Sequence, residues 1–563
     1  MKLWVEASCL YGIINRILTW FMEIYHNSRS DKVIRYVKKV WIESHFGQMG
    51  ERYNEEQPLF LTSAFCIQGR RIINSVFNMI SKILDSIVKN VFGFQNFPQF
   101  MDDKKIRHRL IGIGTIFVLL ATWFTGSGKI FCIGIVILIC MEIFALNYEM
   151  MTYVLALYAP IDFLFRKYLV GIAGIWDELL MIGMFFIWIY KGVRYRQQEK
   201  VKQTPLNSCV GVFIGIFIIL LLISPNFAIS IEGLRAVIQY MFWYFLVLQL
   251  LKDEKSVKRI LLVLVGIVGL LAIHGVYQYI IGIEMPDTWV ESSEDIRTRV
   301  YSIFSSPNVF GSLNLMVFPI AFSMARTSEK RREKSFFLIL MLFMIGALVF
   351  TYSRGAWIGA ACAIGIYVLL KNRKLIIPAI ILGLLVLIFV PSIGNRFLFM
   401  FSDAYLSSSM KGGRLIRWLM ALQILKGHPL VGLGLGQFGG AVAMNNDLTT
   451  ILNGQEISTY YMDNYYLKIA VEAGVIGLIA FVWLMSQIVL VSIRTIGITH
   501  DVKMKELETG ILAGLVGVIC HNLVENVFEV PLMTSLFWML VAVMMHMWFL
   551  NYKKRKDENN VKN

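Results

Sequence analysis

Long apolar runs recur in this chain from residue 110 to residue 551, and they constrain its fold more than any other feature. A helix needs about 20 mostly apolar residues to cross a bilayer, and these runs approach or exceed that length. The chain is 57% hydrophobic and only 16% charged, whereas soluble domains carry about a quarter charged residues. The sequence therefore predicts an all-α polytopic membrane protein with about 12–14 transmembrane helices.

Fourteen segments are placed as spans on this basis. They are residues 110–125, 130–147, 150–165, 177–191, 208–225, 236–251, 259–282, 309–326, 335–352, 355–370, 375–391, 466–493, 509–528 and 532–551.

The connections between these spans differ sharply in basic residues. Six alternate segments hold 25 Lys and Arg residues, and the opposite short connections hold only 7; the six are 191–202, 252–259, 326–334, 371–374, 494–505 and 553–562. Basic residues are retained on the cytoplasmic side, so these six segments and both termini are predicted to be cytoplasmic. This distribution also accounts for the net charge of +16 without a nucleic-acid partner.

The chain divides into five predicted regions. Residues 1–108 form a cytoplasmic or interfacial amphipathic helical region, followed by transmembrane helices at 109–391, a large extracytoplasmic loop at 392–465, C-terminal transmembrane helices at 466–551 and a basic cytoplasmic tail at 552–563. In the first region, apolar residues recur at helical spacing over 73–91, with Lys82, Asp85 and Lys89 on the other face. This helix either lies on the inner membrane surface or docks a cytosolic partner.

Arginines gather on the predicted outer side, against the positive-inside bias. Arg297 and Arg299 lie at the end of one outer segment, Arg354 lies at the mouth of a span, and Arg414 and Arg417 lie early in the long loop. A guanidinium group is a planar, permanent cation that matches phosphate oxygens, so converging arginines would suit an anionic lipid carrier such as a diphosphate. The alternative is that each one reaches a lipid headgroup or pairs with a carboxylate.

Three further features of the outer half carry polar chemistry. Asp463 precedes a predicted helix and is a candidate general base, although the same position suits a helix cap. The GxGxG string at 432–436 follows no predicted strand, so its glycines are expected to let the backbone turn tightly near substrate or another helix. His521 and Glu525 lie one turn apart in a late span, as a proton relay or as a mutual pair.

The seven cysteines show no CxxC or CxxH spacing. Most lie inside apolar runs, where cysteine behaves as a small hydrophobic residue. We therefore expect no disulfide framework, no metal site and no cofactor.

Several motifs occur in the order and rough spacing of the O-antigen ligase / O-antigen polymerase superfamily. They are 351–359 (TYSRGAWIG), 413–418 (GRLIRW), 428–438 (HPLVGLGLGQF) and 463–481 (DNYYLKIAVEAGVIGLIAF), and 299–311 (RVYSIFSSPNVFG) is similar to the stretch before the middle spans of that family. The chain thus resembles this superfamily over roughly residues 110–550.

The resemblance implies a GT-C-like membrane glycosyltransferase that works on the outer face of the bacterial cell membrane. Such enzymes transfer a glycan from a polyprenyl diphosphate, typically undecaprenyl diphosphate, to an acceptor without a nucleotide sugar or a metal. The implied partners are the lipid-linked donor, a glycan acceptor and the lipid bilayer, with a flippase and a chain-length regulator as further candidates.

The same resemblance implies roles for individual residues. Arg299 and Arg414 match basic positions that hold the diphosphate, and Asp463 becomes the candidate base, so these three form the expected catalytic set. Arg354, Arg417, Arg297 and Asn464 are the expected substrate-binding residues. A single displacement at the anomeric carbon would invert its stereochemistry.

One departure bears on the reaction. Ligases of this family commonly carry His-Asn where this chain has Asp463-Asn464. The change favours a polymerase, which joins repeat units into a capsule, exopolysaccharide or teichuronic-type polymer, over a ligase, which attaches a finished glycan to a lipid or wall acceptor. A lipid-linked glycan transporter is the third alternative, but the chain shows no internal repeat and its notable charges lie near the outer surface.

Overall fold

The structure is a computed structural model that describes residues 64–92, scattered residues of 112–123, and residues 148–194, 201–286, 298–389, 391–411, 413–452 and 455–562. In this part of the chain, eight helical stretches are long and apolar enough to cross a membrane. They are α13 (Pro205–Leu222), the α14–α15 stretch (Phe227–Ile238 and Phe242–Leu250), α16 (Glu254–Ile281), α17 (Pro307–Thr327), α18 (Arg331–Phe350), α19 (Arg354–Lys371), α25 (Tyr465–Ile498) and α27 (Pro531–Lys562). The predicted all-α polytopic membrane fold is confirmed.

Four more predicted spans coincide with shorter or more polar helices. Residues 150–165 fall on α9 (Met150–Ala156) and α10 (Tyr158–Tyr168), which α11 (Val170–Ala173) follows. Residues 177–191, 375–391 and 509–528 fall on α12 (Trp176–Arg194), α20 (Ile376–Phe389) and α26 (Val502–His521). The predicted span at 130–147 lies outside the described residues, as does most of 110–125.

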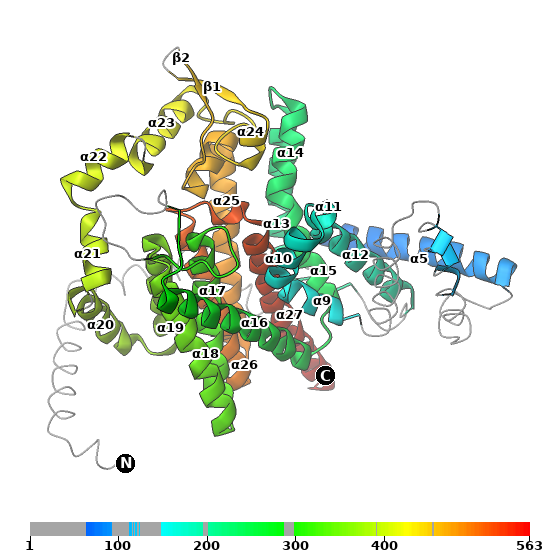
Figure 1. Ribbon diagram of the computed structural model, residues 1–563. Helices are drawn as coiled ribbons and strands as arrows, with labels where there is room; N and C mark the ends of the chain where they lie inside the picture. Colours follow the sequence, from blue (N-terminus) through cyan, green and yellow to red (C-terminus); the bar gives the residue numbers. More distant parts are fainter. Residues whose placement is uncertain are drawn as a thin grey trace, which may run out of the picture. The chain divides into compact units, whose positions relative to one another are not determined.

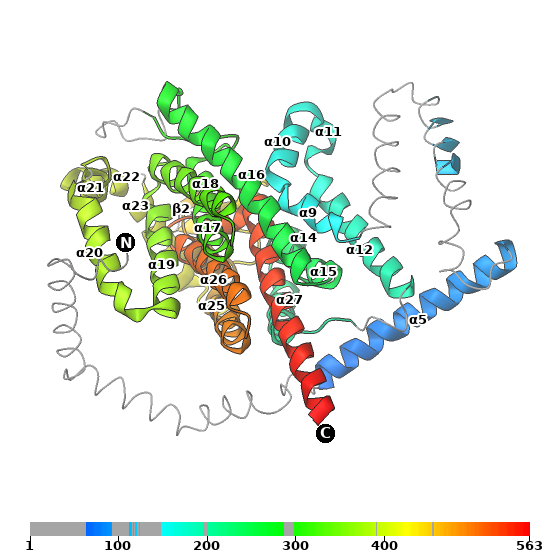
Figure 2. The same ribbon diagram turned by 90° about the horizontal axis from the view of Figure 1, so that it is seen from below.

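The centre of the bundle is formed by α17, α18, α19 and α26, which Figure 2 shows side by side. Small residues let α26 approach its neighbours closely, as is common where membrane helices pack. A Cβ atom added at Gly514 of α26 would lie 2.0 Å from the Met316 carbonyl oxygen of α17, and one added at Gly517 would lie 2.9 Å from the Gly359 carbonyl oxygen of α19. The backbones therefore meet directly, which fixes the helix ends that carry the candidate site.

The predicted loop at 392–465 is largely structured. It contains α21 (Pro391–Phe399), α22 (Asp403–Lys411), α23 (Arg414–Gly427), α24 (Ala441–Asn445) and a hairpin of β1 (Thr449–Leu452) and β2 (Gln455–Ser458). The two strands are antiparallel, with Thr449 opposite Ser458 and Leu452 opposite Gln455. Figure 1 shows α22, α23, α24 and the hairpin at the end of the bundle where α25 begins.

In the N-terminal region, the described part is α5 (Ala64–Phe92), which contains the predicted amphipathic stretch. Its apolar residues Ile72, Val76, Met79, Ile83 and Ile87 are exposed and recur at helical spacing. The helix is confirmed, and its docking to a membrane surface or a partner stays a prediction. The rest of region 1–108 lies outside the described residues.

Candidate active site

The start of α23 carries two of the predicted arginines on one helix face. Arg414 is the first residue of the helix and Arg417 lies one turn later, so their side chains project together. Both guanidinium groups point toward the chain just before α25, where Asp463 lies. The spacing in the GRLIRW motif therefore sets up a pair of cations that faces a single carboxylate.

Asp463 is buried between these two arginines. Arg417 Nη1 donates to Asp463 Oδ1 at 3.0 Å and to the Tyr461 carbonyl oxygen at 3.1 Å. Arg414 Nε lies 3.5 Å from Asp463 Oδ2, and no hydrogen-bond donor among the described residues reaches that oxygen. The Asp463 side chain is thus fixed through Oδ1, while Oδ2 is held only by a longer ion pair.

A second carboxylate links Arg414 to the helical bundle. Arg414 Nη2 donates to Glu525 Oε2 at 2.9 Å, and the Asn308 amide donates to the same oxygen at 2.6 Å. Arg299 Nη2 then donates to Asn308 Oδ1 at 3.1 Å, so a continuous polar chain runs from Arg299 to Asp463. We call the six residues Arg299, Asn308, Arg414, Arg417, Asp463 and Glu525 the arginine–carboxylate cluster.

The three arginines of the cluster differ in accessibility. The Arg414 and Arg417 side chains are 35% and 30% exposed, whereas Arg299 is 7% exposed and its Nε donates to the Thr351 carbonyl oxygen. The predicted convergence of Arg299, Arg414 and Arg417 is therefore present in the structure. The side chains of Arg414 and Arg417 are therefore the more accessible of the three.

Burial changes the acidity of Asp463. Removal from water raises the pKa of its carboxyl above the ordinary value of 3.8, and the Arg414 and Arg417 guanidinium groups oppose that rise. A carboxyl group with a raised pKa is a stronger base once it is ionised. The environment of Asp463 therefore suits proton abstraction better than that of an exposed aspartate.

Asn464, rather than Asp463, caps the following helix. Asn464 Oδ1 accepts a hydrogen bond from the Leu467 backbone N–H at 2.9 Å, at the N-terminus of α25. The capping alternative for Asp463 is thus wrong, because the adjacent residue fills that role. The side-chain oxygen of Asn464 thus forms a structural hydrogen bond, and the expected binding of substrate by Asn464 stays a prediction.

The remaining predicted arginines fall elsewhere. The Arg354 guanidinium lies 5.7 Å and 5.1 Å from the ring centres of Phe399 and Tyr405, so it packs against α21 and α22 through cation–π contacts. Arg297 lies outside the described residues.

Comparison with known proteins identifies the segment that holds most of these residues. Residues 339–482 match the family model described as O-antigen ligase. This chain carries an O-antigen ligase domain. The match supports the resemblance to the O-antigen ligase and polymerase superfamily, and it suggests a glycosyltransferase-like activity. No curated protein matches the chain.

The O-antigen ligase domain contains five of the predicted site residues that the structure describes, namely Arg354, Arg414, Arg417, Asp463 and Asn464. Arg299, Asn308 and Glu525 lie outside the matched segment, yet they complete the cluster. The candidate site is therefore assembled from the domain and from the helix ends that flank it.

The glycine string of the O-antigen ligase domain fills a break in α25. The backbone of Gly474 has a φ of +65°, and a Cβ atom there would lie 2.1 Å from the Leu430 carbonyl oxygen. The Leu433 and Gly434 N–H groups donate to the carbonyls of residues 471 and 472, while the N–H groups of residues 475 and 476 donate to the carbonyls of residues 429 and 430, just before the string. The segment 429–434 thus replaces helical hydrogen bonds at the break, and the expected tight approach of the string to another helix is confirmed.

On the N-terminal side of this break, the first turns of α25 carry a buried charge cluster that was not predicted from the sequence. Lys468 Nζ lies 2.9 Å from Glu472 Oε2 and 3.1 Å from Glu529 Oε1. Glu529 also accepts from the Ala441 N–H and the Asn526 amide. The i to i+4 spacing of Lys468 and Glu472 was the available signal, but their burial could not be read from the chain.

His521 and Glu525 do not form the pair that was one sequence alternative. His521 Nδ1 hydrogen-bonds to the Ser312 hydroxyl, whereas Glu525 lies beyond the end of α26 and bonds to Arg414 and Asn308. No histidine in the described part of the chain hydrogen-bonds to the cluster. Among those residues, there is also no group of three or more His, Cys, Asp or Glu side chains that could hold a metal ion.

Proposed function

We propose that this protein is a polysaccharide polymerase that works on the outer face of the cell membrane. It joins polyprenyl-diphosphate-linked repeat units, with undecaprenyl diphosphate as the typical carrier, into a surface polymer. The proposal places the arginine–carboxylate cluster outside the cell and both termini in the cytoplasm, as the distribution of basic residues predicts. The reaction needs no nucleotide sugar and no metal.

The observation that carries this proposal is the pairing of a buried carboxylate with two partly exposed arginines. Arg414 and Arg417 both lie against Asp463, and 35% and 30% of their side chains are exposed. The cluster has three guanidinium groups against two carboxyl groups, so it favours an anionic ligand. A donor whose diphosphate bridges Arg414 and Arg417 has the anomeric carbon of its attached sugar next to Asp463.

The proposed reaction is a single displacement. The acceptor hydroxyl oxygen forms a bond to the anomeric carbon while the bond from that carbon to the diphosphate oxygen breaks. The electron pair of the broken bond goes to the diphosphate, whose growing charge Arg414 and Arg417 stabilise, and the hydroxyl proton goes to Asp463. The new glycosidic bond has inverted stereochemistry, and the proton then passes to water.

Donor binding also prepares the base. In the described structure, the two arginines neutralise Asp463, and a diphosphate would compete for the same guanidinium groups. Once they turn toward the donor, Asp463 loses part of its counter-charge and becomes more basic. The same two residues thus bind the leaving group and release the base only when a donor is present.

Arg299 acts in this scheme as a positioning residue. It is buried and bonds to the Thr351 carbonyl and to Asn308, which in turn holds Glu525 against Arg414. Its charge fixes the chain of contacts that orients Arg414 rather than touching the diphosphate. This assignment refines the expectation from the sequence that Arg299 binds the diphosphate.

Reconstitution tests the proposal. The purified full-length protein in lipid receives one polyprenyl-diphosphate-linked repeat unit, with excess chelator and no nucleotide, and the products are separated on a gel. We expect a ladder of polymer with the wild type and loss of at least about 100-fold in rate with Arg414→Ala, because removing one such electrostatic contact typically costs that much. Arg373 is an exposed arginine of a predicted cytoplasmic connection, so Arg373→Ala is the matched control and should keep the ladder.

The other outcomes separate the alternatives. Transfer of a preformed glycan to a lipid or wall acceptor, with no ladder from the repeat unit alone, would identify a ligase. Movement of the lipid-linked glycan across the bilayer without a new glycosidic bond would identify a transporter. A ladder that Arg414→Ala leaves unchanged would contradict the role of the cluster.

A further inference from the structure

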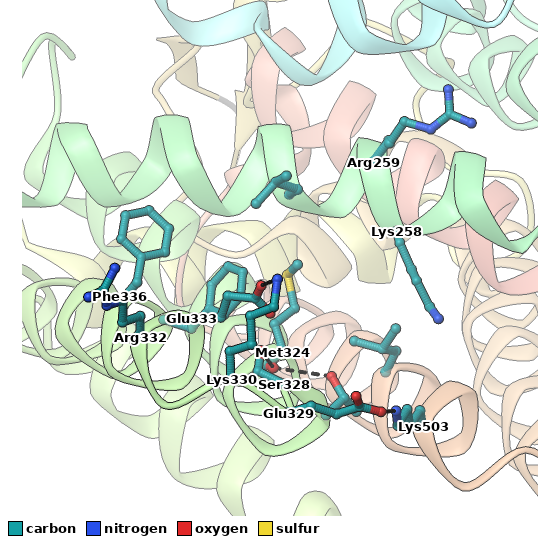
Figure 3. A pocket seen from close by; sticks show the side chains of 14 residues that line it. Lys258, Arg259, Met324, Ser328, Glu329, Lys330, Arg332, Glu333, Phe336 and Lys503 are labelled. Atoms are coloured by element: carbon teal, nitrogen blue, oxygen red, sulfur yellow. Dashed lines mark hydrogen bonds and ion pairs between the residues drawn. The ribbon is translucent and has the colours of Figure 1, made fainter.

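The ends of α16, α17, α18 and α26 opposite the arginine–carboxylate cluster enclose a cavity of about 800 Å³. Figure 3 shows this cavity from close by. Its polar lining comes from the first turn of α16, the end of α17, the start of α18 and the start of α26. We call it the basic cavity, after Lys258, Arg259, Lys330, Arg332 and Lys503, which line it.

Three separate connections of the chain meet at the basic cavity. Lys258 belongs to the connection at 252–259, Arg332 to that at 326–334 and Lys503 to that at 494–505. All three are basic connections that the sequence places on the cytoplasmic side. The fold therefore gathers charges that the sequence shows only as separate topology signals, and the predicted topology puts them at the level of the phospholipid headgroups.

Two cations of the basic cavity have no acidic partner in the described part of the chain. Lys503 pairs with Glu329, Lys330 lies 3.3 Å from Glu333, and Arg259 bonds to Glu149. Lys258 and Arg332 form no such pair there. Figure 3 shows Lys258 extending from α16 toward the side of Lys503, while Arg259 points away from the space between the helices. The cavity thus holds uncompensated positive charge.

The rest of the lining is apolar and continues onto the outer surface of the helices. Leu262, Met324, Phe336, Phe337 and Leu507 line the cavity. Leu262 is 46% exposed and Phe336 is 49% exposed, and the exposed side chains of Ile339 and Leu342 continue the same apolar face along α18. A soluble anion would leave this apolar surface uncovered, whereas an acyl chain would cover it.

We propose that the basic cavity binds one anionic phospholipid from the cytoplasmic leaflet. The headgroup lies within the basic cavity, attracted by the charges of Lys258 and Arg332, and the upper acyl chains lie against Leu262 and Phe336. Basic pockets between transmembrane helices on the cytoplasmic side commonly take acidic headgroups, and the volume is within the range of small-molecule sites. This inference rests on the predicted topology and is independent of the proposed glycosyl transfer.

Native mass spectrometry of the delipidated full-length protein tests it directly. Dioleoyl phosphatidylglycerol is the anionic probe, and dioleoyl phosphatidylcholine is the zwitterionic one. We expect the wild type to bind the first more tightly, and Lys258→Ala/Arg332→Ala to weaken that binding about 30-fold, because each basic residue contributes a few-fold to tenfold in affinity for anionic lipid. Lys258→Arg/Arg332→Lys keeps both charges and should stay within about threefold of the wild type.

Arg373→Ala/Lys374→Ala is the matched control, since it removes two exposed cations from a different cytoplasmic connection. An equal loss in this control would show general surface attraction and overturn the site. Equal binding of the two lipids, or no binding of either, would also overturn it. Competition by glycerol 3-phosphate as effective as that by the lipid would identify a soluble anion instead. Because the readout is binding, failure here is distinct from failure of the reconstituted reaction.

Discussion

The helices α17 and α26 each reach a charge cluster at both of their ends, and the two clusters are built differently. At one end, Asn308 of α17 and Glu525, just beyond α26, belong to the arginine–carboxylate cluster, in which every arginine has a polar partner. At the other end, α16 and α18 hold Lys258 and Arg332 in the basic cavity without acidic partners in the described structure. Helices of 20 to 28 residues separate the two ends by about 30 Å.

The difference concerns orientation more than charge. Guanidinium groups that are fixed by carboxylates and carbonyls are already aimed before a ligand arrives, which is what electrostatic catalysis requires. Cations without fixed partners keep their hydration and side-chain freedom, which suits reversible binding of a headgroup. The comparison therefore predicts that substitutions at the first end change the rate of a reaction, whereas those at the second change a binding affinity.

Asp463→Asn should have the largest effect. It keeps the shape of the side chain and removes the base, so the polymerisation rate should fall by about 10²- to 10⁴-fold, the usual contribution of a general base. Asn464→Ala is the matched change at the adjacent position. It removes the cap of α25, so it should lower the free energy of unfolding by about 1 kcal/mol and leave most of the activity. Initial rates and thermal unfolding of both variants test the contrast.

If Asp463→Asn keeps wild-type activity in a folded protein, the carboxylate only positions Arg417, and the cluster loses its catalytic base. If Asn464→Ala is the more damaging change for rate at equal stability, Asn464 contacts substrate, as the sequence first suggested.

Arg299→Ala should have an intermediate effect. Because Arg299 acts through Asn308 and Glu525, we expect a roughly tenfold loss in kcat with little change in KM for the donor, as in other losses of orientation. Asn308→Ala should give a similar loss. The double variant should lose little more than either single one, since both interrupt the same chain of contacts. Multiplied losses, or a raised KM alone, would instead show that Arg299 binds the diphosphate by itself.

The sequence predicts the residues of the arginine–carboxylate cluster better than it predicts the basic cavity. The apolar runs locate the helices, and Arg299, Arg414, Arg417 and Asp463 are all foreseen because their residue types are unusual on the outer side. The contact between Arg414 and Glu525 is not predicted from the sequence, because 111 residues separate them and only the packing of α26 brings them together. At the basic cavity, local sequence shows three basic connections but not the space they enclose.

Register also limits what the sequence can predict. Asp463 and Asn464 are both residue types that cap helices, and a difference of one position decides which of them is left for chemistry. Arg354 has the same predicted outward placement as the other arginines, yet its guanidinium group packs on the rings of Phe399 and Tyr405. These outcomes depend on tertiary packing rather than on local pattern.

Gly474→Ala tests whether backbone strain is confined to the cluster end. Its positive φ and the close Leu430 carbonyl leave no room for a methyl group, so we expect a loss of about 1–3 kcal/mol in unfolding free energy, together with reduced activity. Gly266→Ala in α16 is the control, because a Cβ atom there has nothing within 4 Å. It should be neutral or stabilise the helix by up to about 1 kcal/mol. Equal melting temperatures for the two variants would contradict this account of the break in α25.

Besides the rate that it loses with a diphosphate contact, Arg417→Ala should shift the pH dependence of the remaining rate, and this shift is the smallest effect that still distinguishes the two ends. Burial raises the pKa of Asp463 above 3.8, and Arg417 opposes that rise. A base must be ionised, so activity should increase with pH through the pKa of Asp463. Removing Arg417 takes away an opposing charge, so the pKa of Asp463 rises further and the acidic limb of the profile moves to higher pH.

Lys258→Ala removes a cation from the distant end and should leave the position of this limb unchanged, because a charge about 30 Å away is screened at physiological ionic strength. An unshifted limb in Arg417→Ala would show that another group sets the acidic side of the profile.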